Sequence, residues 1–143
     1  MRSGLIRAAF GIAATCFLGT GTAAAELVTV VSAKSPVTAL SKDQVANIFL
    51  GRASRFPEGG EAVPIDQVEG ALARDEFYFK LAGKSPAQMN AHWSKIIFTG
   101  RGQPPKEVAN GEAVKRLLLA NPAAIGYIDR SLVDPALRVV LGE

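Results

Sequence analysis

Residues 63–70, V-P-I-D-Q-V-E-G, decide how the rest of the chain is organised. The apolar first half of this stretch predicts a short buried strand, and the polar second half predicts a turn. Residues 71–82 follow at once with the spacing of a helix. In an open α/β sheet, ligands bind where a strand ends and the next helix begins. We therefore expect a ligand site at this turn, although the turn carries two acidic residues, Asp66 and Glu69.

The flanking patterns predict the remaining elements. The β-branched run 27–32 indicates a central strand covered on both faces. Ser41 and Ser85 are predicted N-caps of two helices, and Asn110 caps a third. Residues 99–105 are predicted to be a loop, and residues 124–129 and 138–141 two further strands. The order is β-α-β-α-α-α-β-β, which predicts an α/β fold with a small mixed sheet and flanking helices.

The N-terminal residues have the features of a secretory signal peptide. Arg2 and Arg7 precede an apolar stretch, residues 8–18, that is too short to span a bilayer as an anchor, and residues 23–25 supply a small-residue cleavage site. The sequence therefore predicts a signal peptide at 1–25 and one domain at 26–143. Cys16 offers an alternative as a lipid-attachment site, although the residues before it match that pattern poorly.

Cleavage would leave 118 residues with 14 basic and 13 acidic side chains, so the domain is nearly neutral. A nearly neutral domain gives no reason to expect nucleic acid or an anionic membrane as a partner. Cleavage would also remove the only cysteine, which excludes disulfides, zinc–cysteine sites and cysteine nucleophiles from the domain.

Three stretches together resemble the periplasmic phosphate-binding proteins of ABC importers, which have the type II periplasmic-binding-protein fold. They are V-A-N-I-F-L-G at 45–51, V-P-I-D at 63–66 and N-P-A-A-I-G-Y-I-D at 121–129. The family's chains are two-lobed and far longer, so the resemblance implies one lobe. It also implies a periplasmic location, phosphate or another small oxyanion as ligand, and a membrane transporter or receptor as partner.

The turn departs from the family's ligand motif, an arginine shortly before Ser-Gly-Thr. Here the corresponding residues 66–72 read D-Q-V-E-G-A-L. A phosphate about 4 Å from a carboxylate would be repelled by roughly 4 kcal/mol per pair of unit charges at an effective dielectric constant of 20. We therefore do not expect tight phosphate capture by this turn alone.

Other donors could compensate for this loss. The candidate ligand-binding residues are Gln67, Gly70, Arg74, Thr99 and Arg101. Arg74 lies early in the helix after the turn and could donate to an anion, or it could lie on the helix surface and pair with Asp75, Glu76 or solvent. Arg101 lies in a glycine-containing loop and could bind an anion or be a mobile loop charge.

The sequence does not indicate an enzyme, a metal site or a cofactor. His92 has no partner at a metal-ligand spacing and reads as a partly exposed helix residue. Asp66 and Glu69 read as solvated turn residues rather than a catalytic pair or calcium ligands. No serine has a nucleophile context.

The aromatic side chains are predicted mainly to build the core, with Trp93 and Phe98 among them. Phe77, Tyr78 and Phe79 follow one another on a helix and cannot all face one way, so at least one should be exposed and offer an interaction surface.

Two functions fit these observations. The first is an exported, soluble, solute-binding-protein-like module that binds phosphate or another small anion weakly for transport or sensing. The alternative is a periplasmic accessory subunit of a membrane receptor or transporter that has lost ligand binding. A homodimer could rebuild a two-lobed cleft.

Overall fold

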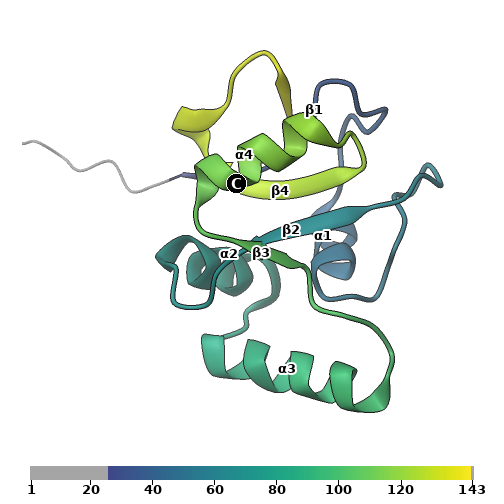
Figure 1. The fold of residues 1–143 in the computed structure, drawn as a ribbon, viewed down its shortest axis with the longest axis vertical. Coiled ribbons are helices and arrows are strands. Elements are labelled where there is room, and N and C mark those ends of the chain that lie inside the picture. The colour runs from purple at the N-terminus through teal and green to yellow at the C-terminus, as the bar shows by residue number, and fades with distance from the viewer. Residues whose placement is uncertain (1–25, 143) are drawn as a thin grey trace, which may run out of the picture.

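The computed structural model describes residues 26–142, in which one five-stranded sheet is covered by helices on both faces (Figure 1). The strands are β1 (Leu27–Ser32), β2 (Val63–Gln67), β3 (Lys106–Val108), β4 (Ala124–Asp129) and β5 (Leu137–Leu141). The helices are α1 (Lys42–Phe49), α2 (Leu72–Ala82), α3 (Pro86–Thr99) and α4 (Gly111–Ala120), with a 3-10 turn η1 (Arg130–Leu132). The predicted α/β class is confirmed, whereas the predicted signal peptide lies outside the described residues.

The sheet is mixed, as predicted, with strand order β3-β2-β4-β1-β5. β2 runs parallel to both β3 and β4, while β1 runs antiparallel to β4 and β5. All six residues of β1 are buried, which confirms the prediction of a strand covered on both faces. Because β2 and β4 run parallel, the polar C-terminal end of β2 lies at the same edge of the sheet as the C-terminal end of β4.

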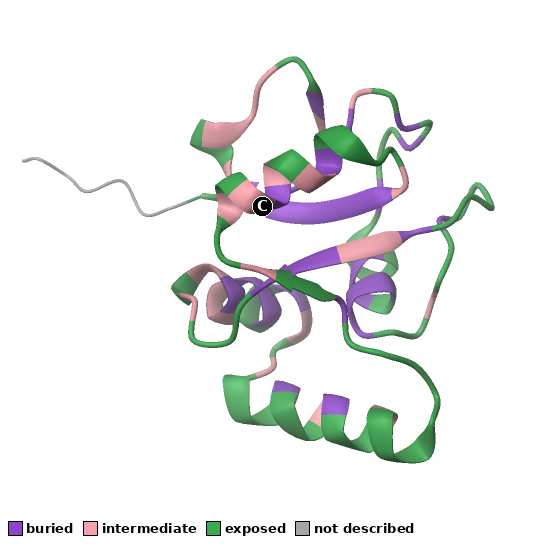
Figure 2. Cartoon of the chain, viewed as in Figure 1, coloured by how far each residue is buried: buried purple, intermediate pink, exposed green. Residues whose placement is uncertain are grey.

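Two apolar clusters pack on opposite faces of the sheet because neighbouring side chains in a strand alternate. Val30 of β1 belongs to the cluster under α4, and the adjacent Val31 belongs to the cluster under α1 and α2. Helix α3 contributes Met89 and Trp93 to the second cluster and leaves most of its surface exposed (Figure 2). The sheet edge that carries the turn is therefore framed by α2 and the start of α3.

Local sequence signals set the helix starts. Ser41 and Ser85 each form a capping box with the residue three positions later, and the Asn110 side chain accepts from the Ala113 N–H. Gly83, at φ 63°, ends α2 in the left-handed conformation that glycine adopts without strain. All three predicted caps are confirmed.

Two expectations were wrong. The prediction had no strand between the third and fourth helices, yet Lys106–Val108 forms β3, an edge strand held by pairing with β2. Phe98 is 93% exposed rather than part of the core, and Ile97 is also exposed. The expectation of an outward aromatic in α2 is confirmed by Phe79, which is 67% exposed.

Candidate functional site

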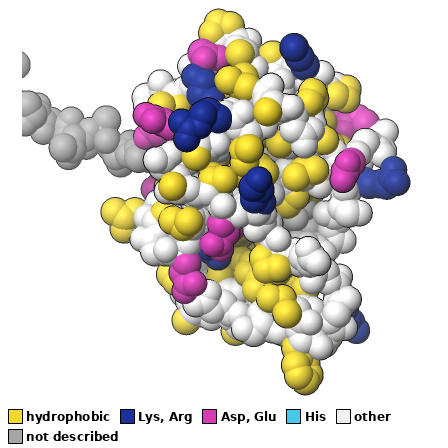
Figure 3. Space-filling model, in the orientation of Figure 1, with side chains coloured by type: hydrophobic (Ala, Val, Ile, Leu, Met, Phe, Trp, Pro, Cys, Tyr) yellow, Lys and Arg dark blue, Asp and Glu magenta, His cyan; other side chains and the backbone are white. Residues whose placement is uncertain are grey.

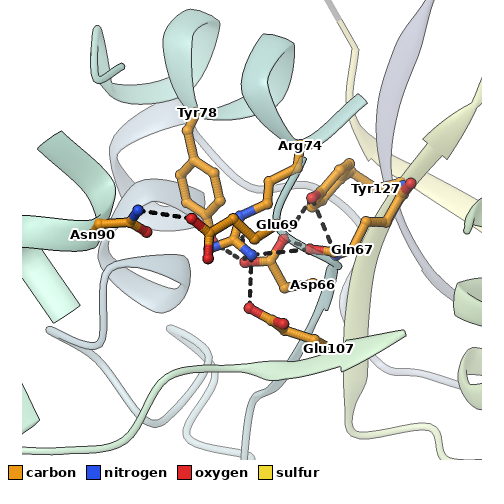
Figure 4. Close-up of polar contacts among 8 residues, drawn as sticks. All are labelled: Asp66, Gln67, Glu69, Arg74, Tyr78, Asn90, Glu107 and Tyr127. Atoms are coloured by element: carbon orange, nitrogen blue, oxygen red, sulfur yellow. Dashed lines mark hydrogen bonds and ion pairs between the residues drawn. The ribbon is translucent and has the colours of Figure 1, made fainter. Parts of the chain in front are cut away.

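The end of β2 carries a carboxylate that is sealed inside the protein. Asp66 is only 1% exposed, because it belongs to the strand and points at the aromatic side chains of β4 and α2 (Figure 4). The interpretation of Asp66 as a solvated turn residue is therefore wrong. Glu69, three residues later, is exposed and accepts a hydrogen bond of 2.8 Å from Asn90 of α3.

Two tyrosine hydroxyls and one backbone amide satisfy this carboxylate. Tyr127 of β4 donates to Oδ1 at 2.5 Å, and Tyr78 of α2 donates to Oδ2 at 2.6 Å. The backbone N–H of Gln67 also donates to Oδ1, at 2.8 Å. Asp66 thus accepts inside the fold the kind of hydrogen bonds that a bound anion would accept from a protein.

Arg74, near the start of α2, joins Asp66 and its hydrogen-bond partners in one polar network. Its Nε lies 3.9 Å from Asp66 Oδ2, and its Nη1 lies 2.6 Å from Glu107 Oε1 of β3 and 3.2 Å from the backbone oxygen of Gln67. The residue is 6% exposed. The interpretation of Arg74 as a helix-surface residue paired with Asp75, Glu76 or solvent is wrong, because it faces the sheet with Tyr78.

Gln67 takes part through its backbone and its side chain. Its N–H also approaches the Tyr127 hydroxyl at 3.2 Å, and its Nε2 donates to the Tyr127 backbone oxygen at 3.1 Å. Gly70 follows in the exposed turn at φ 90°, a conformation that favours glycine. The structure therefore brings Gln67 and Arg74 together and sets Gly70 at the rim of the same turn.

Thr99 and Arg101 lie at the other end of α3. Thr99 is nine residues beyond Asn90, the α3 residue that contacts the turn, which is about 13 Å along a helix axis. The Thr99 hydroxyl donates to the backbone oxygen of Lys95 at 2.8 Å, and the Arg101 side chain is exposed. Within residues 26–142, no hydrogen bond or ion pair joins either residue to the turn. Ligand binding by the five candidate residues stays a prediction.

The turn has little free volume. The hollow beside Arg74, bordered by Tyr78, Lys84 and Asn90, measures about 10 Å³. A space of this size holds about one water molecule. Phosphate would therefore need a rearrangement of the surrounding side chains.

Burial sets the protonation of the network. It raises the pKa of Asp66, and the hydrogen bonds from Tyr127 and Tyr78 and the charge of Arg74 offset this only in part. Burial and the Asp66 carboxylate raise the pKa of both tyrosines, so both stay protonated donors at neutral pH. Burial lowers the pKa of Arg74, but the attraction of Asp66 and Glu107 outweighs it and the net shift is upward. The network thus holds one cation against two carboxyl groups.

The sequence interpretation missed Tyr78, Tyr127 and Glu107 as parts of this site. The sequence did indicate that Arg74 and Tyr78 face inward. Arg74, Tyr78 and Leu81 follow one another at spacings of four and three residues, which places them on one face of a helix. Glu107 gave no signal because its strand was not predicted.

The wider surface carries charges of both signs (Figure 3). Figure 3 shows acidic and basic side chains interspersed over one face. His92 is half-buried, as predicted, and one ring nitrogen lies 2.8 Å from the Leu50 backbone oxygen. In residues 26–142 no group of three or more His, Cys, Asp and Glu side chains could hold a metal ion. None of the helices described there has the length and apolar character needed to cross a membrane.

Comparison with known proteins identifies the fold. No protein-family model matches the sequence, and no curated protein matches it significantly. A phosphate ABC transporter substrate-binding protein from Clostridium perfringens, solved with bound phosphate, superposes with a TM-score of 0.64 at 21% identity, over 81% of this chain and 44% of that one. An ABC-type phosphate transport receptor from Vibrio cholerae gives a TM-score of 0.61 at 19% identity, over 81% and 45%.

PstS from Borrelia burgdorferi gives a TM-score of 0.59 at 14% identity, over 81% of this chain and 46% of that one. In each case the match covers most of this chain but less than half the length of the solved protein. The chain therefore has the fold of the phosphate-binding proteins of ABC transporters. Its length is consistent with a single-lobe variant of that fold.

Proposed function

We propose that the protein is an exported accessory module of a transport or sensing system, in which the former ligand turn has become a structural ion network. One observation carries this proposal: Arg74 donates to Glu107 and to the backbone of Gln67 in its own chain, while Asp66 accepts the tyrosine hydroxyls. The strong donors at the turn are thus engaged by the protein itself. An arriving oxyanion would have to displace Glu107 and would then meet the Asp66 carboxyl.

Weak binding of phosphate or another small anion is the second candidate function. It is favoured by Glu107, whose side chain is 43% exposed and could swing into solvent, leaving Arg74 Nη1 free. One charge-assisted hydrogen bond contributes about 1.5–3 kcal/mol, less than the roughly 4 kcal/mol that a millimolar dissociation constant requires. Such binding would be no tighter than millimolar unless Gly70, Thr99 or Arg101 contributed further donors.

Helix α2 offers the surface through which an accessory module would act. Leu72 and Phe79 are seven positions apart and therefore share a face, and they are 85% and 67% exposed. They point away from the buried face that carries Phe77 and Leu81. Large apolar side chains exposed on one face are typical of a protein contact. The proposed partner is a membrane transporter or receptor, and the proposed location is the periplasm after cleavage at residue 25.

Site-specific photo-crosslinking in cells tests this function. A photoreactive residue would replace Leu72 or Phe79 in the full chain, and the exposed loop residue Lys34 would serve as the matched control position. We expect an adduct with one membrane protein from positions 72 and 79 but not from 34. Adducts that are absent, or equal at all three positions, would refute the accessory role. An adduct of twice the protein's own mass would instead identify the homodimer.

Fractionation of the same cells tests export. We expect a periplasmic protein whose intact mass corresponds to residues 26–143. A cytoplasmic protein, or one that keeps residues 1–25, would contradict the proposed location.

A further inference from the structure

A second and larger hollow lies on the α2 face of the sheet. It has a volume of about 290 Å³ and lies between β1, β5, α2 and the start of α1. None of its lining residues belongs to the Asp66 network. The nearest link between the two is Phe77, which lines the hollow and stacks on Tyr127 with 3.8 Å between ring centroids. The hollow is therefore a separate site.

The walls of this hollow are apolar and firmly held. Leu27 of β1 and Phe77 and Leu81 of α2 are all buried members of the core, and Leu141 of β5 packs against them. Walls built from core side chains keep their shape without a ligand, so the hollow is preformed. Its volume is near the lower end of the range of about 300–1,000 Å³ found for small-molecule sites, which indicates a ligand of few atoms.

One polar group in the wall has no partner in the protein. Thr29 of β1 lines the hollow and is 3% exposed, yet its hydroxyl forms no hydrogen bond with another residue in 26–142. The hydroxyl is not sealed from the hollow, because the only fully buried side-chain polar atom without a partner in residues 26–142 is Trp93 Nε1. Thr29 thus offers a hydrogen bond to whatever fills the space.

Among the described residues, two charged side chains, both lysines, line the mouth. Lys42 opens α1 and Lys80 lies on α2, and no acidic side chain within residues 26–142 is among the lining residues. Lys80 contacts Glu76 on the helix surface at 3.0 Å and has a further partner, so its charge is already engaged. Lys42 forms no ion pair with another described residue. Lys42 is therefore the cation best able to attract a ligand.

We propose that this hollow binds a small monocarboxylate with an aliphatic or aromatic body. The body would lie against Leu27, Phe77 and Leu81, and the carboxylate would lie at the mouth beside Lys42, within reach of the Thr29 hydroxyl. Phosphate has no apolar body to lie against these walls, and most of its four oxygens would lose water without gaining a donor. The ligand class thus differs from that of the proteins whose fold this chain shares.

Methyl NMR of the exported protein tests this site, with octanoate as the probe and 1-octanol and inorganic phosphate as comparisons. We expect octanoate to shift the methyl signals of Leu27, Leu81 and Leu141 with a dissociation constant below about 1 mM. Octanol should bind about five-fold more weakly or worse, because it lacks the charge. Phosphate should leave these signals unchanged.

Two charge variants complete the test. Lys42→Met should weaken octanoate binding about three- to ten-fold and leave octanol binding unchanged. The matched variant Lys34→Met, which removes an exposed lysine from the β1–α1 loop, should change neither. The proposal is overturned if octanoate leaves the three leucine signals in place, if octanol binds as tightly as octanoate, or if Lys42→Met behaves like Lys34→Met.

Discussion

The hydroxyl of Tyr127 lies 2.5 Å from Oδ1 of Asp66, although the two residues are 61 positions apart in the chain. The contact joins the ends of two parallel strands, β2 and β4, at the sheet edge where a ligand would be expected. A carboxylate of the protein itself occupies this position. We therefore expect the turn to stabilise the fold and to have little capacity for an external anion.

Removing the Tyr127 hydroxyl should destabilise the protein. Tyr127→Phe keeps the ring stacked on Phe77 but deletes the donor to Asp66, and we expect a loss of about 1–3 kcal/mol in the free energy of unfolding. Urea denaturation measures it. Phe79→Leu, an exposed substitution on α2, should change stability by no more than about 0.5 kcal/mol. Equal stability of Tyr127→Phe and wild type would show that the contact is energetically unimportant.

Arg74 should matter more at neutral pH than in acid. Arg74→Met leaves the Asp66 carboxyl without its buried cation, which we expect to cost about 2–4 kcal/mol at pH 7. Protonation of Asp66 removes the uncompensated charge. The stability difference between wild type and Arg74→Met should therefore become smaller as the pH falls. Thermal and urea unfolding at several pH values measure this. Arg101→Met, which removes an exposed arginine, is the control, and a loss that is independent of pH would argue against the pairing.

The contribution of Asp66 to stability should increase as the pH falls. Burial raises its pKa in the folded protein above the ordinary value of 3.8, so in that pH interval the folded state holds more protons than the unfolded state. Stability then falls as the pH rises through the folded pKa. The unfolding free energy of wild type minus that of Asp66→Asn should therefore increase from neutral pH to about pH 4. A difference that decreases over this range would mean that the folded pKa is lowered.

Gly126 should tolerate no side chain. It lies on β4 beneath α4, and a Cβ at this position would overlap Cγ1 of Val114. We expect Gly126→Ala to destabilise the fold by about 1–3 kcal/mol through overpacking. Gly60→Ala is the matched control, because no atom lies near its added Cβ. If the clash is the cause, Val114→Ala in the same chain should recover part of the loss.

The sequence predicts what local patterns determine. The caps at Ser41, Ser85 and Asn110 and the buried strand β1 depend on neighbouring residues, and all were predicted correctly. β3 is three residues long and exists through its pairing with β2, so no local pattern marks it.

The candidate site was harder to predict for the same reason. Asp66 is buried because Tyr127, far away in sequence, supplies a donor, and nothing in the turn itself indicates this. The inward position of Arg74 was predictable from its spacing to Tyr78. The separation of Thr99 from the turn depends on how α3 lies on the domain, which local sequence does not determine.

The central claim is that Glu107 prevents Arg74 from binding external anions. A calorimetric titration of the protein with inorganic phosphate tests this claim most directly. We predict no heat of binding for wild type up to about 1 mM phosphate, and weak binding that becomes detectable above it in Glu107→Gln, which removes the competing charge. Glu69→Gln, at the exposed neighbouring acid, should behave like wild type. Wild-type binding with a dissociation constant below about 0.1 mM would contradict the account.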